Sequence, residues 1–244
     1  MEHTVRSFDE QLRRLNEIIL RMGGLAEAAL SSAMQAVTKR DVDLAAEIVR
    51  DDAKIDELYQ EVDQLAVRLL ALRQPMASDL REIVAALRIS ADVERIGDYA
   101  ANIAKRSIAM AEMRPSRSLP GIARMGRLAQ RLIKEVLDAY AEKNAEKAVA
   151  VWARDEEIDD AYNSLFRETL TYMMEDPRAI TPSAHLLFIA KNIERIGDHA
   201  TNVAETIYYM VKGQPLKESR PKGDMSPFVT APGAPPEEPG TPKA

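Results

Sequence analysis

The chain has 244 residues, with 46% hydrophobic and only 5% aromatic side chains, and its formal net charge is −6. This acidic balance argues against a nucleic-acid-binding protein, whose affinity would rest on a basic surface that neutralises phosphates. The absence of cysteine excludes disulfides and thiolate metal sites.

The amino-terminal residues 1–6 are polar, and no hydrophobic segment of a signal peptide follows them. No uninterrupted apolar run approaches the ~20 residues that a transmembrane helix needs. We therefore expect a cytoplasmic protein that does not insert into a membrane, while partners can hold it at the inner membrane.

Apolar spacing and proline divide the chain into long helices. Leu12, Leu15 and Ile19 follow the three- and four-residue spacing of one helical stripe. The prolines at positions 75, 115, 120, 177 and 182 are expected in turns, because proline costs ~3 kcal/mol inside a helix. The predicted helices span about residues 8–38, 41–74, 78–112, 122–140, 145–174 and 183–211, with a connecting segment at 113–121.

The sequence also contains an internal repeat. Residues 94–104 and 194–204 are identical at eight of eleven positions, and Met22-Gly23 is matched by Met125-Gly126. A unit of this length is a domain rather than a solenoid repeat. Long helices joined by short turns pack as antiparallel bundles. We therefore predict an all-α protein of two tandem three-helix bundles, residues 1–114 and 115–212.

The last 32 residues differ from the rest. The segment 213–244 holds eight of the thirteen prolines and few apolar side chains. Such a segment cannot bury enough surface to offset its ordering entropy. We expect it to be a disordered tail, and we assign it no role.

Acidic pairs recur at equivalent places in the two copies. On a helix, Glu94 and Asp98 differ by only about 40° in direction, and the apolar positions lie on nearly the opposite side, so the pair is expected to point outward. If neighbouring helices bring their pairs together, each copy gathers four carboxylates. The predicted clusters are Asp52, Asp56, Glu94 and Asp98 in the first copy, and Asp155, Asp159, Glu194 and Asp198 in the second.

Four gathered carboxylates require raised pKa values or a cation. An all-oxygen cluster suits Mg²⁺, Mn²⁺ or Ca²⁺, and carboxylate-rich sites also take iron. Asn102 and Asn202 extend the two stripes as weaker candidates, and His199 is matched by Tyr99, which excludes a shared role. Gly97 and Gly197 are read as points where a neighbouring helix approaches closely.

These features together resemble the PhoU family of bacterial phosphate-uptake regulators. The resemblance rests on the acidic pairs, the repeated Arg-Ile-Gly-Asp segment and residues 22–25, and it covers about residues 5–211. It implies a pseudo-twofold pair of bundles with surface metal clusters containing iron, zinc, magnesium or manganese. It also implies a homodimer and a repressor of the phosphate-starvation response, acting between a Pst-type transporter ATPase and a PhoR-type sensor histidine kinase.

We therefore expect a metal-binding regulator that is not an enzyme. Two alternatives remain. One is an all-α metal-dependent pyrophosphohydrolase, against which the outward, open placement of the carboxylates argues. The other is a plain helical scaffold whose acids form only a solvated face.

Overall fold

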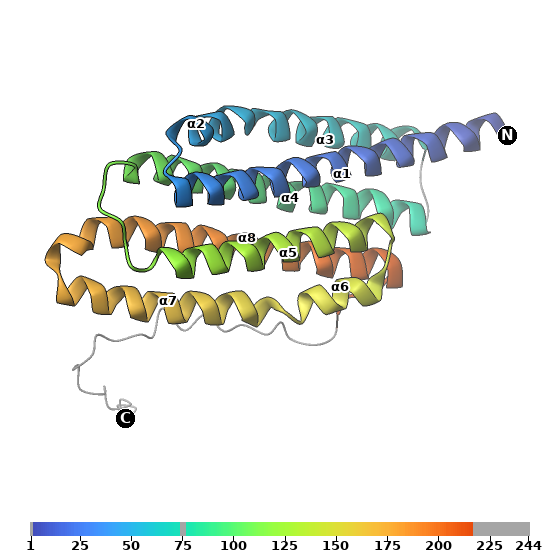
Figure 1. Cartoon of the computed structure of the whole chain (residues 1–244). Coiled ribbons are helices and arrows are strands. Elements are labelled where there is room, and N and C mark those ends of the chain that lie inside the picture. The colour runs from blue at the N-terminus through green and yellow to red at the C-terminus, as the bar shows by residue number, and fades with distance from the viewer. Residues whose placement is uncertain (1, 74–76, 217–244) are drawn as a thin grey trace, which may run out of the picture.

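A computed structural model describes residues 2–73 and 77–216, and the regular structure in these ranges is entirely helical (Figure 1). This confirms the predicted all-α class. The elements are α1 (Glu2–Lys39), α2 (Val42–Asp51), α3 (Ala53–Arg73), α4 (Ala77–Met110), α5 (Leu119–Ala141), α6 (Ala145–Trp152), α7 (Asp155–Glu175), the 3₁₀ turn η1 (Pro177–Ala179) and α8 (Ile180–Lys212).

The helices form two bundles that lie side by side along their lengths (Figure 1). Helices α1 to α4 make the first bundle, and α5 to α8 make the second. The bundles meet mainly where α4 packs on α8, and α1 also packs on α5. Equivalent helices of the two copies therefore face each other across the interface, as expected for a duplicated chain.

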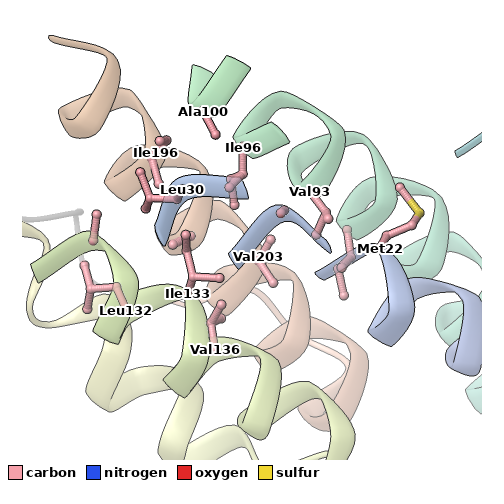
Figure 2. Close-up of a cluster of buried hydrophobic side chains, with 14 of the residues drawn as sticks. Met22, Leu30, Val93, Ile96, Ala100, Leu132, Ile133, Val136, Ile196 and Val203 are labelled. Carbon is pink, nitrogen blue, oxygen red and sulfur yellow. The ribbon is translucent and has the colours of Figure 1, made fainter. Parts of the chain in front are cut away.

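The two bundles share one hydrophobic core. The buried apolar side chains form a single cluster that includes residues from both copies. Figure 2 shows Leu30 and Ile96 of the first bundle close to Ile133 and Ile196 of the second. Full burial of each such side chain is worth roughly 1.5–3 kcal/mol. Each bundle therefore depends on its neighbour for part of its stability.

The second and fifth predicted helices are each divided in two, so their prediction as single helices was wrong. The first is interrupted at Asp52, whose N–H donates to the carbonyl of Ile48 at 3.2 Å while its own carbonyl accepts from Ile55 at 2.9 Å. The second is interrupted at Ala153 and Arg154. Neither break contains glycine or proline. Each break instead lies beside acidic residues. The helix that follows the break has its positive amino end there, which favours acidic residues in its first turn.

Prolines 120 and 182 lie inside helices rather than in turns, which corrects the predicted starts of α5 and α8. Both occupy the first turn, where a proline is tolerated because the N–H it lacks has no intrahelical partner. Pro177 opens the short η1 turn. Among the prolines in residues 77–216, the prediction of a turn failed only where proline begins a helix, and Pro75 lies outside the described residues.

Helix α8 ends at Gly213, whose φ of 73° is the left-handed conformation that closes many helices. The predicted disordered tail begins at this residue, but residues 217–244 lie outside the described part of the chain. None of the helices within the described ranges is both long and apolar enough to span a bilayer.

The repeated Met-Gly pairs mark the crossing of α1 and α5. A Cβ atom built on Gly23 would lie 2.3 Å from Leu137, and one built on Gly126 would lie 2.7 Å from Met34. These two contacts are equivalent in the two copies. Glycine is thus present because the helices approach too closely for a larger residue.

We predict opposite effects for alanine at two adjacent glycines of α1. A Cβ on Gly24 meets no atom within 4 Å, so Gly24→Ala should raise the free energy of unfolding by about 0.5–1 kcal/mol. Gly23→Ala should lower it by about 1 kcal/mol, because overpacking against Leu137 outweighs the gain in helix propensity. Urea unfolding measures both values, and equal stabilisation by the two changes would contradict the close approach of α1 and α5.

Candidate metal centre

Two glycines position the predicted carboxylates by admitting a neighbouring helix. A Cβ on Gly97 of α4 would lie 2.7 Å from Ile55 and 3.5 Å from Oδ1 of Asp52. In the second copy, a Cβ on Gly197 of α8 would lie 2.8 Å from Ile158. The predicted structural role of these glycines is confirmed. The close packing brings the acidic residues of two helices together.

In the first copy the four predicted carboxylates form a partly exposed cluster. Arg95 donates to Oδ2 of Asp98 at 2.9 Å, and its Nε lies 3.3 Å from Oε2 of Glu94. Burial raises the pKa of Asp52, and neighbouring Asp98 and Asp56 raise it further. Burial and Asp98 likewise raise the pKa of Glu94. The carboxylates of α3 and α4 therefore lie close enough to repel one another.

In the second copy three of the four carboxylates are buried, and Asp198 is half-buried. Asp155, Asp159 and Glu194 are only 3%, 6% and 5% exposed. Thr201 donates to Oδ1 of Asp155 at 3.0 Å, and Lys191 donates to Oε1 of Glu194 at 2.9 Å. The other carboxylate oxygen of Glu194, Oε2, is buried and has no hydrogen-bond partner among the described residues. An orphaned anionic oxygen in the interior is costly.

Burial also raises the pKa of Glu194. The hydrogen bond from Lys191 lowers the pKa, while Asp198 and Asp159 raise it. The net direction is upward, so the ionised form of Glu194 is unfavourable where it lies. A bound cation would relieve this cost.

The predicted outward placement of the carboxylates is correct for the first cluster and wrong for the second. The two copies also diverge in sequence beside the clusters. Lys191 and Thr201 of α8 are matched by Ala91 and Ala101 of α4. The open placement that argued against a hydrolase therefore holds for only one copy.

Sequence reasoning missed Lys191 and Thr201 as members of the second cluster. The signal was present, since both lie on the same face of the helix as Glu194, three residues before it and seven after. A polar residue that replaces alanine in one copy of a repeat marks a local change of environment.

The helix breaks give each cluster a helix amino terminus. Asp52 immediately precedes α3, and Asp155 is the first residue of α7. The amino end of a helix carries a partial positive charge, which stabilises a nearby carboxylate by about 0.3–1 kcal/mol. This favourable term partly offsets the repulsion within each cluster.

The weaker candidates contact other groups. Asn202 donates to Oδ1 of Asp92 at 3.4 Å, and His199 lies 2.7 Å from the same oxygen. Asn102 accepts from Lys105 at 3.5 Å. Within residues 2–73 and 77–216, no three acidic or imidazole side chains are already arranged to hold one ion. The carboxylates are gathered, but they would have to rotate to share a ligand.

The fold and the clusters define a class of protein: a duplicated helical chain with one carboxylate cluster in each copy. The PhoU domain model matches residues 19–107 and again residues 122–207. The chain therefore belongs to the PhoU family, as the sequence predicted.

Individual relatives agree with this assignment over nearly the whole chain. A Caulobacter vibrioides protein described as a phosphate-specific transport system accessory protein PhoU homolog is 51% identical, covering 92% of this chain and 98% of the relative. The crystal structure of PhoU from Pseudomonas aeruginosa has a TM-score of 0.83 and 38% identity, covering 85% of this chain and 100% of that one. The phosphate transport system regulatory protein PhoU from Streptococcus pneumoniae has a TM-score of 0.80 and 29% identity, with 86% and 100% covered.

We predict that Glu194→Gln stabilises the metal-free protein at pH 7. The pKa of Glu194 is raised above its ordinary value of 4.5, so ionisation costs stability once the pH rises through the folded-state pKa. The variant should gain on the order of 1 kcal/mol at pH 7 and lose this advantage near pH 4, where the carboxyl group is protonated in both states.

Urea unfolding of chelator-treated protein at the two pH values measures the difference. Glu57→Gln, at an exposed site on α3, is the control and should change little at either pH. Equal destabilisation by Glu194→Gln at both pH values would show that ionisation of Glu194 does not lower the stability of the folded protein.

Proposed function

We propose that this protein is a metal-binding negative regulator of phosphate uptake and phosphate-starvation signalling. The observation that carries the metal assignment is the pair of carboxylate clusters at equivalent places, one with a buried oxygen of Glu194 that has no hydrogen-bond partner in residues 2–73 and 77–216. The role in phosphate transport rests on the PhoU family and on relatives named as accessory or regulatory proteins of that system.

The donor set fits a hard or borderline cation. The first site would use Asp52, Asp56, Glu94 and Asp98, and the second would use Asp155, Asp159, Glu194 and Asp198. Only carboxylate oxygens are offered, which suits magnesium, manganese or iron best and also admits zinc. The ion, single or in a multinuclear cluster, would supply positive charge that cancels the repulsion of the acids. Lys191 would remain available to hold one oxygen of Glu194.

The regulator acts by docking rather than by catalysis in this proposal. Its partners are the ATPase subunit of a Pst-type phosphate transporter and a PhoR-type sensor histidine kinase. We further propose a homodimer located in the cytoplasm, held at the inner membrane only through these partners. Charged surfaces give such contacts specificity and fast association.

We predict that Asp98→Asn combined with Asp198→Asn lowers the bound metal by at least about half, because each site loses an anionic ligand. Helicity by circular dichroism should not change, since both residues lie within long helices. The matched control is Asp63→Asn with Asp138→Asn, which removes two exposed carboxylates outside the clusters. Metal content measured by mass spectrometry should fall only in the first variant, and equal content in all three proteins would refute the ligand assignment.

We expect deletion of the gene to induce alkaline phosphatase in phosphate-rich medium. A repressor of the starvation response keeps this activity low when phosphate is plentiful, so its loss should raise the activity and a restored copy should lower it again. Activity is measured in the deletion strain, in the restored strain and in the parent, whose induction on phosphate removal is the control. Unchanged low activity in a deletion strain that carries no second copy of the gene would contradict the proposal.

A further inference from the structure

A basic groove lies where α4 and α8 meet, on the opposite end of the interface from Asp92 and His199. We call it the seam groove. It has a volume of about 520 Å³ and is open to solvent. Its lining residues are Asn102, Lys105, Arg106 and Ala109 of α4 with Phe188, Asn192 and Arg195 of α8.

The seam groove carries three cations and no acid. Lys105, Arg106 and Arg195 form no ion pair with any acidic residue in the described part of the chain. Neighbouring like charges repel, so three cations in a groove lined by no acid favour an anionic partner.

The equivalent face of the other copy carries acids that bind its own side chains. There Asp92 replaces Asn192 and contacts His199 and Asn202, while Glu205 replaces Lys105 and accepts from Trp152. The two faces derive from one duplicated sequence, yet only the seam groove is lined by cations without an acid. This divergence sets the seam groove apart from an ordinary solvated face.

The same divergence gives the seam groove an exposed aromatic ring. Phe188 is 54% exposed, and the guanidinium group of Arg106 lies 4.4 Å from the centre of its ring. At the matching position the other groove has Arg88, which instead lies over Tyr209. Exposed arginine and aromatic side chains are the residues that most often anchor protein interfaces.

The shape of the groove favours a protein segment over a small anion. A small ligand is usually enclosed on most of its surface, whereas this groove is open along the seam. A free phosphate ion would also leave the exposed part of the Phe188 ring uncovered. A chain segment that carries carboxylates beside an apolar side chain can form ion pairs with the cations and also pack on the ring of Phe188.

We propose that the seam groove docks an acidic segment of a partner protein, with carboxylates on Lys105, Arg106 and Arg195 and an apolar side chain on Phe188. The proposal deepens the docking role above and rests on it for the identity of the partner. Lys105 also links the groove to the first cluster, where it lowers the pKa of Asp52 against the larger effect of burial.

The test uses the full-length protein with the purified transporter ATPase subunit and the cytoplasmic part of the sensor kinase. The variant is Lys105→Glu with Arg106→Glu and Arg195→Glu. The control reverses one lysine and two arginines on the outer face of α5, namely Arg127→Glu, Arg131→Glu and Lys134→Glu, which are all exposed. Both variants change the net charge equally, and circular dichroism confirms that both are folded.

We expect the groove variant to weaken binding to at least one of the two partners by about tenfold or more, and the control to leave it within about twofold. Phe188→Ala should weaken the same complex without any change in charge. Lysine substitutions of acidic residues in the partner should restore binding to the groove variant.

Equal binding by the wild type, the groove variant and the control would overturn the groove assignment while leaving the docking function intact. Binding of neither partner by the wild type would overturn the docking function itself, and with it the groove proposal. Loss of bound inorganic phosphate in the groove variant, with partner binding unchanged, would make the groove a small-anion site. A change of oligomeric state in the groove variant alone would make its occupant a second copy of the chain.

Discussion

The close packing of α3 on α4 at Gly97, and of α7 on α8 at Gly197, is the constraint from which the candidate sites follow. Without a side chain at these positions, Ile55 and Ile158 approach the glycine backbones directly. The acidic side chains on the flanks of the same helices therefore lie close to one another. Packing thus places carboxylates where ionisation is costly: burial first, and neighbouring carboxylates second, raise the pKa values of Asp52, Glu94 and Glu194.

The duplication produces two copies of this arrangement, and the copies differ in which groups balance the negative charge of the carboxylates. The first cluster is partly open to solvent and uses Arg95 as a counter-ion. The second is buried and uses Lys191 and Thr201 instead. A metal ion would therefore replace solvent in one copy and relieve an interior charge in the other. We expect two sites of unequal affinity, with the buried site the more selective of the two.

The sequence was sufficient to predict the helical class, the duplication, the family and the clustering of acids from paired helices, because helical periodicity and the repeat are local signals. It did not reveal the helix breaks at Asp52 and Arg154, which contain neither glycine nor proline. It also misjudged the burial of Asp155 and Glu194, since burial depends on how the helices of one bundle pack in the folded chain. The seam groove was equally hidden, because Lys105 and Arg195 lie on different copies and meet only in the folded chain.

The most direct measurement of the central claim is an anomalous difference map from crystals of the protein grown with manganese. The account predicts a peak between α3 and α4 and another between α7 and α8, each within coordination distance of carboxylates from both helices. It also predicts that the side chains of Glu94 and Glu194 turn toward these peaks. A map with no peak at either cluster, and with the carboxylates placed as they are here, would contradict the claim that the packed acids form metal sites.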